Sequence, residues 1–262
     1  MAVVGMIGTG NMGSAIARAA RKSAHTTRLL LANRSPEKAA RLAEELGGEV
    51  CSNREAAAQA ELLFLAVKPQ MLAEMFAGIR ETLARRKDRF VLVSMVAGWS
   101  LKRLEAELGP WPFVRIMPDI PAAVGSGVTL LCAGEGITEE EKALVREVLA
   151  GTGLVSELSE QQLDAANGVT GCGPAFAAMF VEALADGAVA CGLPRQQALT
   201  YAAQMLRGSA ELLLQEGAHP GTLKDRVCSP GGSTIQGVRV LEESAFRAAV
   251  MNAVIATFEK KF

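Results

Sequence analysis

Histidine and cysteine are scarce in this chain and form no pattern. The two histidines, His25 and His219, stand alone, so a histidine-rich metal site is not expected. The five cysteines are odd in number and contain no CxxC pair, which argues against a disulfide framework and against a zinc site. They are Cys51, Cys132, Cys172, Cys191 and Cys228. A reducing cytoplasm is the compartment that fits this cysteine usage.

An excess of charge of either sign is also missing. Lysine and arginine total 27 against 28 acidic residues, so the balance gives no reason to expect nucleic acid or an anionic membrane as a partner. The basic cluster at 85–87 is interpreted as a solvated helix end. The chain begins directly with a predicted strand, and we expect no signal peptide. The longest apolar helix, 174–191, carries Glu182 and Asp186, which favours a buried helix over a membrane span.

The first thirteen residues carry the strongest local motif. An apolar run, 3–7, leads directly into the sequence GTGNMG, which is typical of a strand, a tight turn and the start of a helix. Gly8 permits the turn, Gly10 lets a pyrophosphate approach the backbone, and Gly13 lets the helix pack closely on the strand. The free N–H groups and the positive dipole end of that helix favour an anion. The residues predicted to bind a dinucleotide here are Gly8, Thr9, Gly10, Asn11, Met12 and Gly13.

The surroundings of this turn decide its interpretation, because glycine-rich turns close many strands for purely structural reasons. Apolar residues recur at helical spacing from Met12 to Ala20. A second apolar run, 29–32, falls where the next parallel strand of a βαβ unit should lie. The context therefore favours dinucleotide binding.

The residues after the second strand indicate which dinucleotide. A site that prefers NAD usually ends this strand with Asp or Glu, which holds the ribose 2′-hydroxyl. Here the residues are Asn33, Arg34 and Ser35, and Arg34 with Ser35 could hold a 2′-phosphate instead. The alternative is an exposed arginine beside a helix start. We therefore predict NADPH as the cofactor, with NADH as the alternative.

Two later turns fall at the same predicted edge of the sheet. Further strands are predicted at 62–66, 90–95, 113–117, 128–132 and 154–158. Ligands of parallel sheets bind at the carboxyl ends of strands, which makes Ala66, Val67, Lys68 and Pro69 candidate cofactor residues. For the turn Ala97–Gly98, a cofactor contact and a purely structural turn are equally well supported. Residues 118–121, Pro-Asp-Ile-Pro, are expected to form a rigid loop.

The predicted strands stop at residue 158. Ser159 and Gln162 form a capping-box pattern, and every later segment is predicted helical, with breaks at 171–174, 192–194, 217–221 and 229–232. The fold class is therefore α/β, with a Rossmann-type, largely parallel sheet domain at 1–158 and an all-helical domain at 159–262. The apolar helix 174–191 needs burial on every side. We expect a second subunit to cover part of it; burial inside the monomer is the alternative.

A glycine-rich break in the helical region carries the most specific chemistry. It runs from 227 to 237 with the sequence VCSPGGSTIQG. Serine and threonine hydroxyls and free N–H groups converge there on one anion-sized point at the start of a helix. The ligand favoured on this chemistry is a small carboxylate, and the alternative is a loop that only caps the helix. The candidate residues are Ser229, Gly231, Gly232, Ser233 and Thr234.

Taken together, these motifs resemble those of the pyrroline-5-carboxylate reductase family. The likeness covers nearly the whole chain and includes GTGNMG, the turn at 33–35, AVKP at 66–69, RIMP at 115–118, TGCGPAF at 170–176 and SPGGSTIQG at 229–237. The last motif is highly specific to the family. The resemblance implies hydride transfer from NAD(P)H to the C=N bond of 1-pyrroline-5-carboxylate, which gives L-proline in the last step of proline biosynthesis.

The resemblance also implies roles for individual residues. Ser229, Gly232, Ser233 and Thr234 would bind the substrate carboxylate and ring nitrogen, and Thr234 is the candidate catalytic residue, placed to hydrogen-bond that nitrogen. The family further implies a homodimer with interlocking helical domains, often within a ring of dimers. We expect the dinucleotide site and the carboxylate site to face one shared cleft.

Four positions depart from the family pattern. Asp119 stands where asparagine is usual, and Thr170, Cys172 and Phe176 replace residues of the usual SGSGPAY. Asp119 is expected to alter the hold on the ribose or nicotinamide of the cofactor, and Phe176 removes a hydroxyl near the substrate. These changes bear on the rate more than on the reaction.

Two other functions compete with the reductase. A hydroxyacid dehydrogenase of related fold needs a lysine and an asparagine four residues apart, and the matching positions here are Ala177 and Val181. A non-catalytic NADP-binding regulator is suggested by Asp119 and Phe176, but it would not need the intact SPGGST sequence. A reductase of a related imine is a further alternative.

Overall fold

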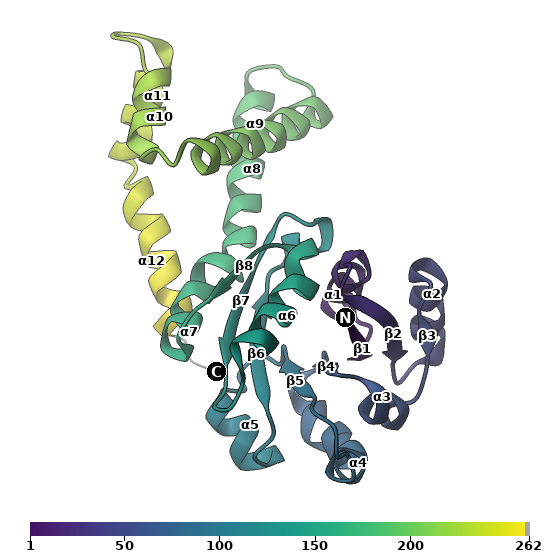
Figure 1. Ribbon diagram of the computed structural model, residues 1–262. Coiled ribbons are helices and arrows are strands. Elements are labelled where there is room, and N and C mark those ends of the chain that lie inside the picture. The colour runs from purple at the N-terminus through teal and green to yellow at the C-terminus, as the bar shows by residue number, and fades with distance from the viewer. Residues whose placement is uncertain (260–262) are drawn as a thin grey trace. The chain divides into compact units, whose positions relative to one another are not determined.

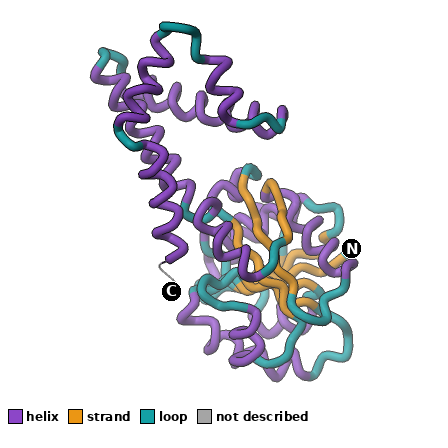
Figure 2. The backbone as a smooth tube through the Cα atoms, turned by 90° about the vertical axis from the view of Figure 1, so that its left-hand side faces the viewer, coloured by secondary structure: helices purple, strands orange, loops and turns teal. Residues whose placement is uncertain are grey.

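The protein forms two compact units, residues 1–171 and the residues from Cys172 onward, in a computed structural model that describes residues 1–259. The first unit contains a sheet with helices on both faces, and the described part of the second contains helices only (Figures 1 and 2). The predicted fold class is confirmed.

The sheet of the first unit has eight strands in the order β3-β2-β1-β4-β5-β6-β7-β8. All neighbours pair parallel except β6 and β7, which are antiparallel. The chain order reverses between β1 and β4, and such switch points are where open α/β sheets bind ligands. The strands are β1 Ala2–Ile7, β2 Thr26–Ala32, β3 Glu49–Val50, β4 Leu62–Leu65, β5 Val91–Ser94, β6 Phe113–Pro118, β7 Gly127–Ala133 and β8 Gly153–Glu157.

Helices cover both faces of this sheet and form two cores. On one face α1, α2 and α6 pack on buried residues such as Val4 and Phe64. On the other face α3, α4, α5 and α7 pack on residues such as Leu63 and Phe113. The bounds are α1 Asn11–Lys22, α2 Pro36–Leu46, α3 Asn53–Gln59, α4 Leu72–Ala84, α5 Leu101–Leu108, α6 Glu139–Leu149 and α7 Glu160–Thr170, with 3-10 helices at Pro69–Met71, Ile120–Val124 and Ala150–Thr152.

Local capping signals fix several helix starts. The predicted capping box of Ser159 and Gln162 is formed at the start of α7. Pro36 begins α2, and Gly47 ends it in the left-handed conformation with φ of 61°. By contacts, α7 packs on β7 and β6 of the first unit. The domain division at 158/159, which follows the end of the strands, stays a prediction.

Two details of the sheet differ from the sequence expectation. The two-residue strand β3 was not expected, and Pro118 pairs with Thr129 as the last residue of β6 instead of starting a loop. Proline is tolerated at this position because the ladder between β5 and β6 ends at Arg115, so its missing N–H is not needed there.

Arg86 is not a solvated helix end. Its side chain is only 5% exposed, and its guanidinium donates hydrogen bonds to the carbonyl oxygens of Ala57 and Ala60. It therefore satisfies carbonyl groups at the end of α3, and it also lies 4.4 Å from the ring centre of Phe90.

The second unit consists of helices separated by the predicted breaks. They are α8 Gly173–Ala190, α9 Arg195–Glu216, α10 Pro220–Val227, α11 Ser233–Glu243 and α12 Phe246–Glu259. A further break at Ser244–Ala245 carries no glycine or proline, and Ala245 adopts a φ of 56°. Within α8 only Ala185 is buried, so the described helices of its own unit do not bury this apolar helix. By length and composition alone residues 160–190 could cross a membrane, but a single helix of this kind is weak support for a span.

Candidate functional site

The strand ends beside the switch point form one row. Ile7 is in register with Ala32 and with Leu65, and Leu65 is in register with Ser94. The next residue of each strand therefore lies at the carboxyl edge of the sheet. These residues are Gly8, Asn33, Ala66 and Met95.

The three glycines of the first turn have the geometry that a dinucleotide turn needs. Gly8 adopts a φ of 105°, which side-chain-bearing residues rarely reach. A Cβ on Gly13 would lie 2.1 Å from the carbonyl oxygen of Gly8, so only glycine allows this approach of α1 to the turn. A Cβ on Gly10 would meet no heavy atom within 4 Å. Gly10 therefore leaves open space at the N-terminus of α1, where a phosphate can reach the backbone N–H groups.

A cleft of about 380 Å³ lies against this turn. Predicted cofactor residues from two separate segments, the glycine turn and the end of β4, come together in its wall. The lining residues are Gly10, Asn11, Met12, Gly13, Ala66, Val67, Lys68 and Met95. Met95 was not predicted, because as the last apolar residue of its segment it is indistinguishable from a core residue.

Asn33 ties the glycine turn to the start of α2. Its Oδ1 accepts a hydrogen bond from the Thr9 N–H at 3.1 Å, and its Nδ2 donates to the Ser35 carbonyl at 3.1 Å. Arg34 is exposed and makes no ion pair or hydrogen bond within residues 1–259. Its guanidinium is therefore free for a ligand at the end of β2.

Pro69 and the turn Ala97–Gly98, which were also predicted to bind the cofactor, lie outside the wall of this cleft. Pro69 begins a 3-10 helix directly after Lys68, whose exposed ammonium has no partner in the described residues. The exposed turn Ala97–Gly98 follows β5, and Gly98 adopts a φ of 74°. Arg103 donates a hydrogen bond to the Gly98 carbonyl at 3.3 Å and stacks on Trp99 at 4.2 Å from the ring centre.

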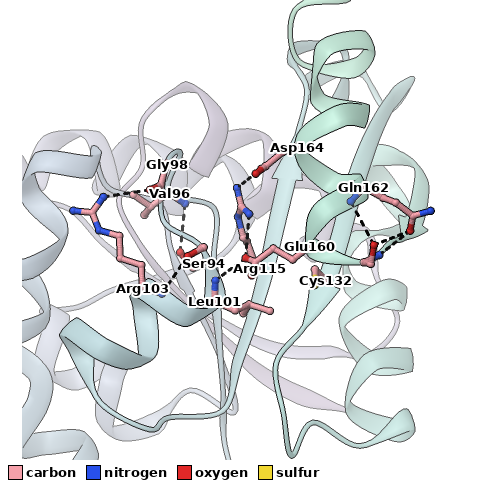
Figure 3. Close-up of polar contacts among 12 residues, drawn as sticks. Ser94, Val96, Gly98, Leu101, Arg103, Arg115, Cys132, Glu160, Gln162 and Asp164 are labelled. Atoms are coloured by element: carbon pink, nitrogen blue, oxygen red, sulfur yellow. Dashed lines mark hydrogen bonds and ion pairs between the residues drawn. The ribbon is translucent and has the colours of Figure 1, made fainter. Parts of the chain in front are cut away.

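A buried arginine lies next to this turn (Figure 3). Arg115 of β6 is in register with Ser94, and its side chain is 4% exposed. Its guanidinium donates to Glu160 at 3.1 Å and to Asp164 at 3.0 Å, both on α7. The Glu160 carboxylate also accepts the backbone N–H of Leu101 at 2.6 Å. Sequence reasoning missed this cluster, because residues 45 positions apart give no local signal.

Asp119 points into its own loop. It is 7% exposed, and its Oδ1 accepts the Ala122 N–H at 3.2 Å at the start of the 3-10 helix Ile120–Val124. Burial raises the pKa of the Asp119 carboxyl, and backbone hydrogen bonds at Val128 and Ala122 oppose this rise. The expected effect of Asp119 on the cofactor stays a prediction.

We expect Asp119→Asn to stabilise the protein at neutral pH. Because the folded state raises the pKa of this carboxyl, ionisation costs stability as the pH rises from the unfolded pKa through the folded one. Asparagine keeps the oxygen acceptor without the charge. The variant should therefore melt at a higher temperature than the wild-type protein at pH 7.

The pH dependence checks this interpretation of Asp119. Below about pH 4 the unfolded-state carboxyl is protonated as well, so the two melting curves should converge. Thermal melts between pH 4 and pH 8 measure the difference. A lower melting temperature for the variant at pH 7 would mean that the ionised carboxylate stabilises the loop.

The second candidate site lies in the second unit, at the N-terminus of α11. Gly232 is the N-cap of α11, with no side chain bonded to the first turn, and Gly231 adopts a φ of 70°. A Cβ on Gly232 would lie 2.3 Å from the Ser229 Oγ, so this hydroxyl lies close to the helix start. Among residues 1–259, the hydroxyls of Ser229, Ser233 and Thr234 have no hydrogen-bond partner. The loop therefore does not cap its own helix with these hydroxyls, and they remain available to a ligand.

The site residues fit a dinucleotide. Besides the open space at Gly10, the buried Thr9 hydroxyl has no hydrogen-bond partner in the described chain. Within residues 1–259 no group of three or more His, Cys, Asp or Glu side chains could hold a metal ion.

These features define a dinucleotide-binding α/β protein with a separate helical region. Residues 3–98 match the family model described as NADP oxidoreductase coenzyme F420-dependent. Residues 160–261 match the model described as pyrroline-5-carboxylate reductase dimerisation.

Whole-chain comparisons give the family. Pyrroline-5-carboxylate reductase of Escherichia coli is 40% identical over 98% of this chain and 96% of its own length. The solved structure of the Coxiella burnetii reductase has a TM-score of 0.92 at 29% identity, covering 99% of this chain and 97% of that one. The Plasmodium falciparum reductase, solved with NADP bound, has a TM-score of 0.85 at 30% identity with the same coverage. The chain belongs to the pyrroline-5-carboxylate reductase family.

Proposed function

We propose that this protein reduces 1-pyrroline-5-carboxylate to L-proline with NADPH, as the last step of proline biosynthesis in the cytoplasm. The observation that carries the proposal is the pair of open helix N-termini. One, at α1, is lined by glycine backbone, and the other, at α11, is lined by unpartnered hydroxyls. The first suits a pyrophosphate and the second a small carboxylate. The names of the relatives support the same reaction.

The reaction asks little acid–base chemistry of the protein. When bound, NADPH supplies a hydride to the imine carbon, the C=N bond becomes a C–N bond, and the nitrogen gains or already carries the proton. The chain has to bind the carboxylate, orient the ring and favour the protonated imine. Ser229, Ser233 and the N–H groups at Gly231–Gly232 would hold the carboxylate. The Thr234 hydroxyl would hydrogen-bond the ring nitrogen and relay a proton from water.

The preference for NADPH is proposed to depend on Arg34. Its free guanidinium follows β2, where an Asp or Glu would serve NAD. Arg34→Ala should raise KM for NADPH roughly tenfold, since hydrogen bonds to charged groups contribute about 1.5–3 kcal/mol, and should leave KM for NADH nearly unchanged. Steady-state kinetics with both cofactors measure the ratio. Equal changes for NADPH and NADH would remove Arg34 from recognition of the 2′-phosphate.

The second unit is proposed to form a homodimer, with a ring of such dimers as the larger assembly. Its apolar side chains are widely exposed in the single chain, among them Met179, Met205 and Met251. A groove of about 730 Å³ between α8 and α9 is lined by residues such as Ala177, Met179 and Leu206. Covering this surface with a second copy removes an apolar area too large to leave in water. We propose no membrane and no nucleic acid as partners.

One assay distinguishes the proposed reaction from a hydroxyacid dehydrogenase and from a non-catalytic regulator. Oxidation of NADPH and of NADH is measured by absorbance with 1-pyrroline-5-carboxylate, with a six-membered-ring imine analogue and with hydroxyacids. The proposal expects turnover with the five-membered imine and NADPH at the highest kcat/KM. Turnover of hydroxyacids alone would support the related dehydrogenase. Cofactor binding without turnover of any substrate would support a regulator.

A further inference from the structure

We infer that Arg115 and Glu160 are positioning residues for the nicotinamide half of the cofactor, and that they act through the backbone N–H of Leu101. The inference rests on the proposed function, because it assumes that the cofactor extends along the strand ends from β1 toward β5.

The turn in question connects β5 to α5. It begins at Met95, which lines the cofactor cleft, and ends at Leu101, the first residue of α5. A dinucleotide in this type of sheet lies across the switch point between β1 and β4, with the adenosine on the β2 side. Arg34 at the end of β2 therefore marks the adenosine half, and the turn after β5 marks the nicotinamide half.

Hydrogen bonds at both ends hold this turn (Figure 3). At the start, the Ser94 Oγ accepts the Val96 N–H at 3.4 Å. At the end, the Ser100 hydroxyl caps α5 by accepting the Arg103 N–H at 3.1 Å. The Leu101 N–H has no partner within its helix and donates to Glu160 at 2.6 Å. Since α7 carries Glu160, the turn is fixed to a helix outside its own segment.

Arg115 fixes the position of Glu160 in turn. Its side chain is 4% exposed, whereas the side chain of Glu160 is 29% exposed and that of Asp164 is 55% exposed. A buried guanidinium needs its anionic partners, because a charge left unpaired in the interior is costly. The Nε of Arg115 already has no hydrogen-bond partner in the described residues, so the bonds from its two terminal nitrogens carry the contact. The pair Arg115–Glu160 thus holds the Leu101 N–H in one place.

The test compares a ligand that contains the nicotinamide with one that does not. NADP⁺ spans the whole cofactor site, whereas 2′,5′-ADP contains only the adenosine half with its 2′-phosphate. Glu160→Ala should weaken NADP⁺ binding about tenfold, or about 1.4 kcal/mol, and leave 2′,5′-ADP binding within about twofold. Glu160→Gln keeps an oxygen acceptor for Leu101 and should restore most of the NADP⁺ affinity. Titration calorimetry on the full-length protein measures both ligands.

A second pair of variants isolates the N–H group itself. Proline is tolerated at the first position of a helix and removes the N–H, so Leu101→Pro should reproduce the split seen with Glu160→Ala. Leu101→Ala also removes the packing of the leucine side chain but keeps the backbone N–H, and it serves as the matched control. The comparison of these two variants tests the role of the Leu101 N–H even if Glu160→Ala does not fold.

The outcomes separate this inference from the proposed function. Equal loss of NADP⁺ and 2′,5′-ADP binding, or no loss of either, would overturn the positioning role. Identical behaviour of Leu101→Pro and Leu101→Ala would overturn it as well. Both results come from binding alone, so they hold whether or not the wild-type protein reduces 1-pyrroline-5-carboxylate, which the kinetic assay decides independently.

Discussion

Gly10→Ala is expected to weaken NADPH binding by about 100-fold, or about 2.7 kcal/mol, without destabilising the fold. An added Cβ at Gly10 meets no protein atom within 4 Å, so the chain accommodates it. The same methyl group occupies the space where a phosphate would approach the N-terminus of α1. Fluorescence titration with NADPH and a thermal melt measure the two quantities separately.

Two other glycines provide controls for this prediction. Gly78 in α4 also has no heavy atom within 4 Å of an added Cβ. Gly78→Ala should therefore lower neither the affinity for NADPH nor the stability of the fold. Gly13→Ala should instead destabilise the protein, because its Cβ would lie 2.1 Å from the backbone oxygen of Gly8. Wild-type affinity for NADPH in Gly10→Ala would mean that the pyrophosphate lies elsewhere.

Thr234→Ala is expected to lower kcat by about 100-fold, the lower end of what a positioned proton donor or acceptor contributes. KM for NADPH should stay within about twofold, because the expected contact of Thr234 is with the substrate nitrogen and not with the cofactor. Thr234 is exposed and its hydroxyl has no partner in the described residues, so the fold should not depend on it. Initial-rate assays at saturating substrate measure kcat directly.

The conservative replacement sharpens this second prediction. Thr234→Ser keeps the hydroxyl and should recover most of the turnover. An unchanged kcat in Thr234→Ala would remove this residue from the mechanism. A drop in both variants would assign the effect to the methyl group and to packing around the start of α11.

Local signals explain why much of the fold could be predicted from the sequence. The capping boxes at Ser52, Thr138 and Ser159 depend on residues three positions apart, and all three are formed. The glycine turn was equally predictable, because the positive φ of Gly8 and the close approach of Gly13 to the Gly8 carbonyl oxygen are local features of the turn.

Features that depend on distant partners could not be predicted. The guanidinium of Arg86 is buried by carbonyl groups 26 and 29 residues earlier, and Arg115 finds its carboxylates on α7 only when β6 and α7 pack together. The short strand β3 has two residues, too few for any periodicity. The hydroxyls at the start of α11 were predictable as a set, but the ligand that they bind stays a prediction.

The proposed reaction requires the cofactor and the substrate carboxylate to lie in one cleft. A crystal structure of the protein with NADP⁺ and L-proline tests this requirement most directly. The quantity to measure is the distance from nicotinamide C4 to proline Cδ, the ring carbon next to nitrogen that does not carry the carboxylate. The account predicts about 3–3.5 Å, the separation that reacting atoms need, with the proline carboxylate at the N-terminus of α11 of the same or a partner subunit. Proline bound away from Ser229–Thr234, or a nicotinamide far from every copy of that loop, would contradict it.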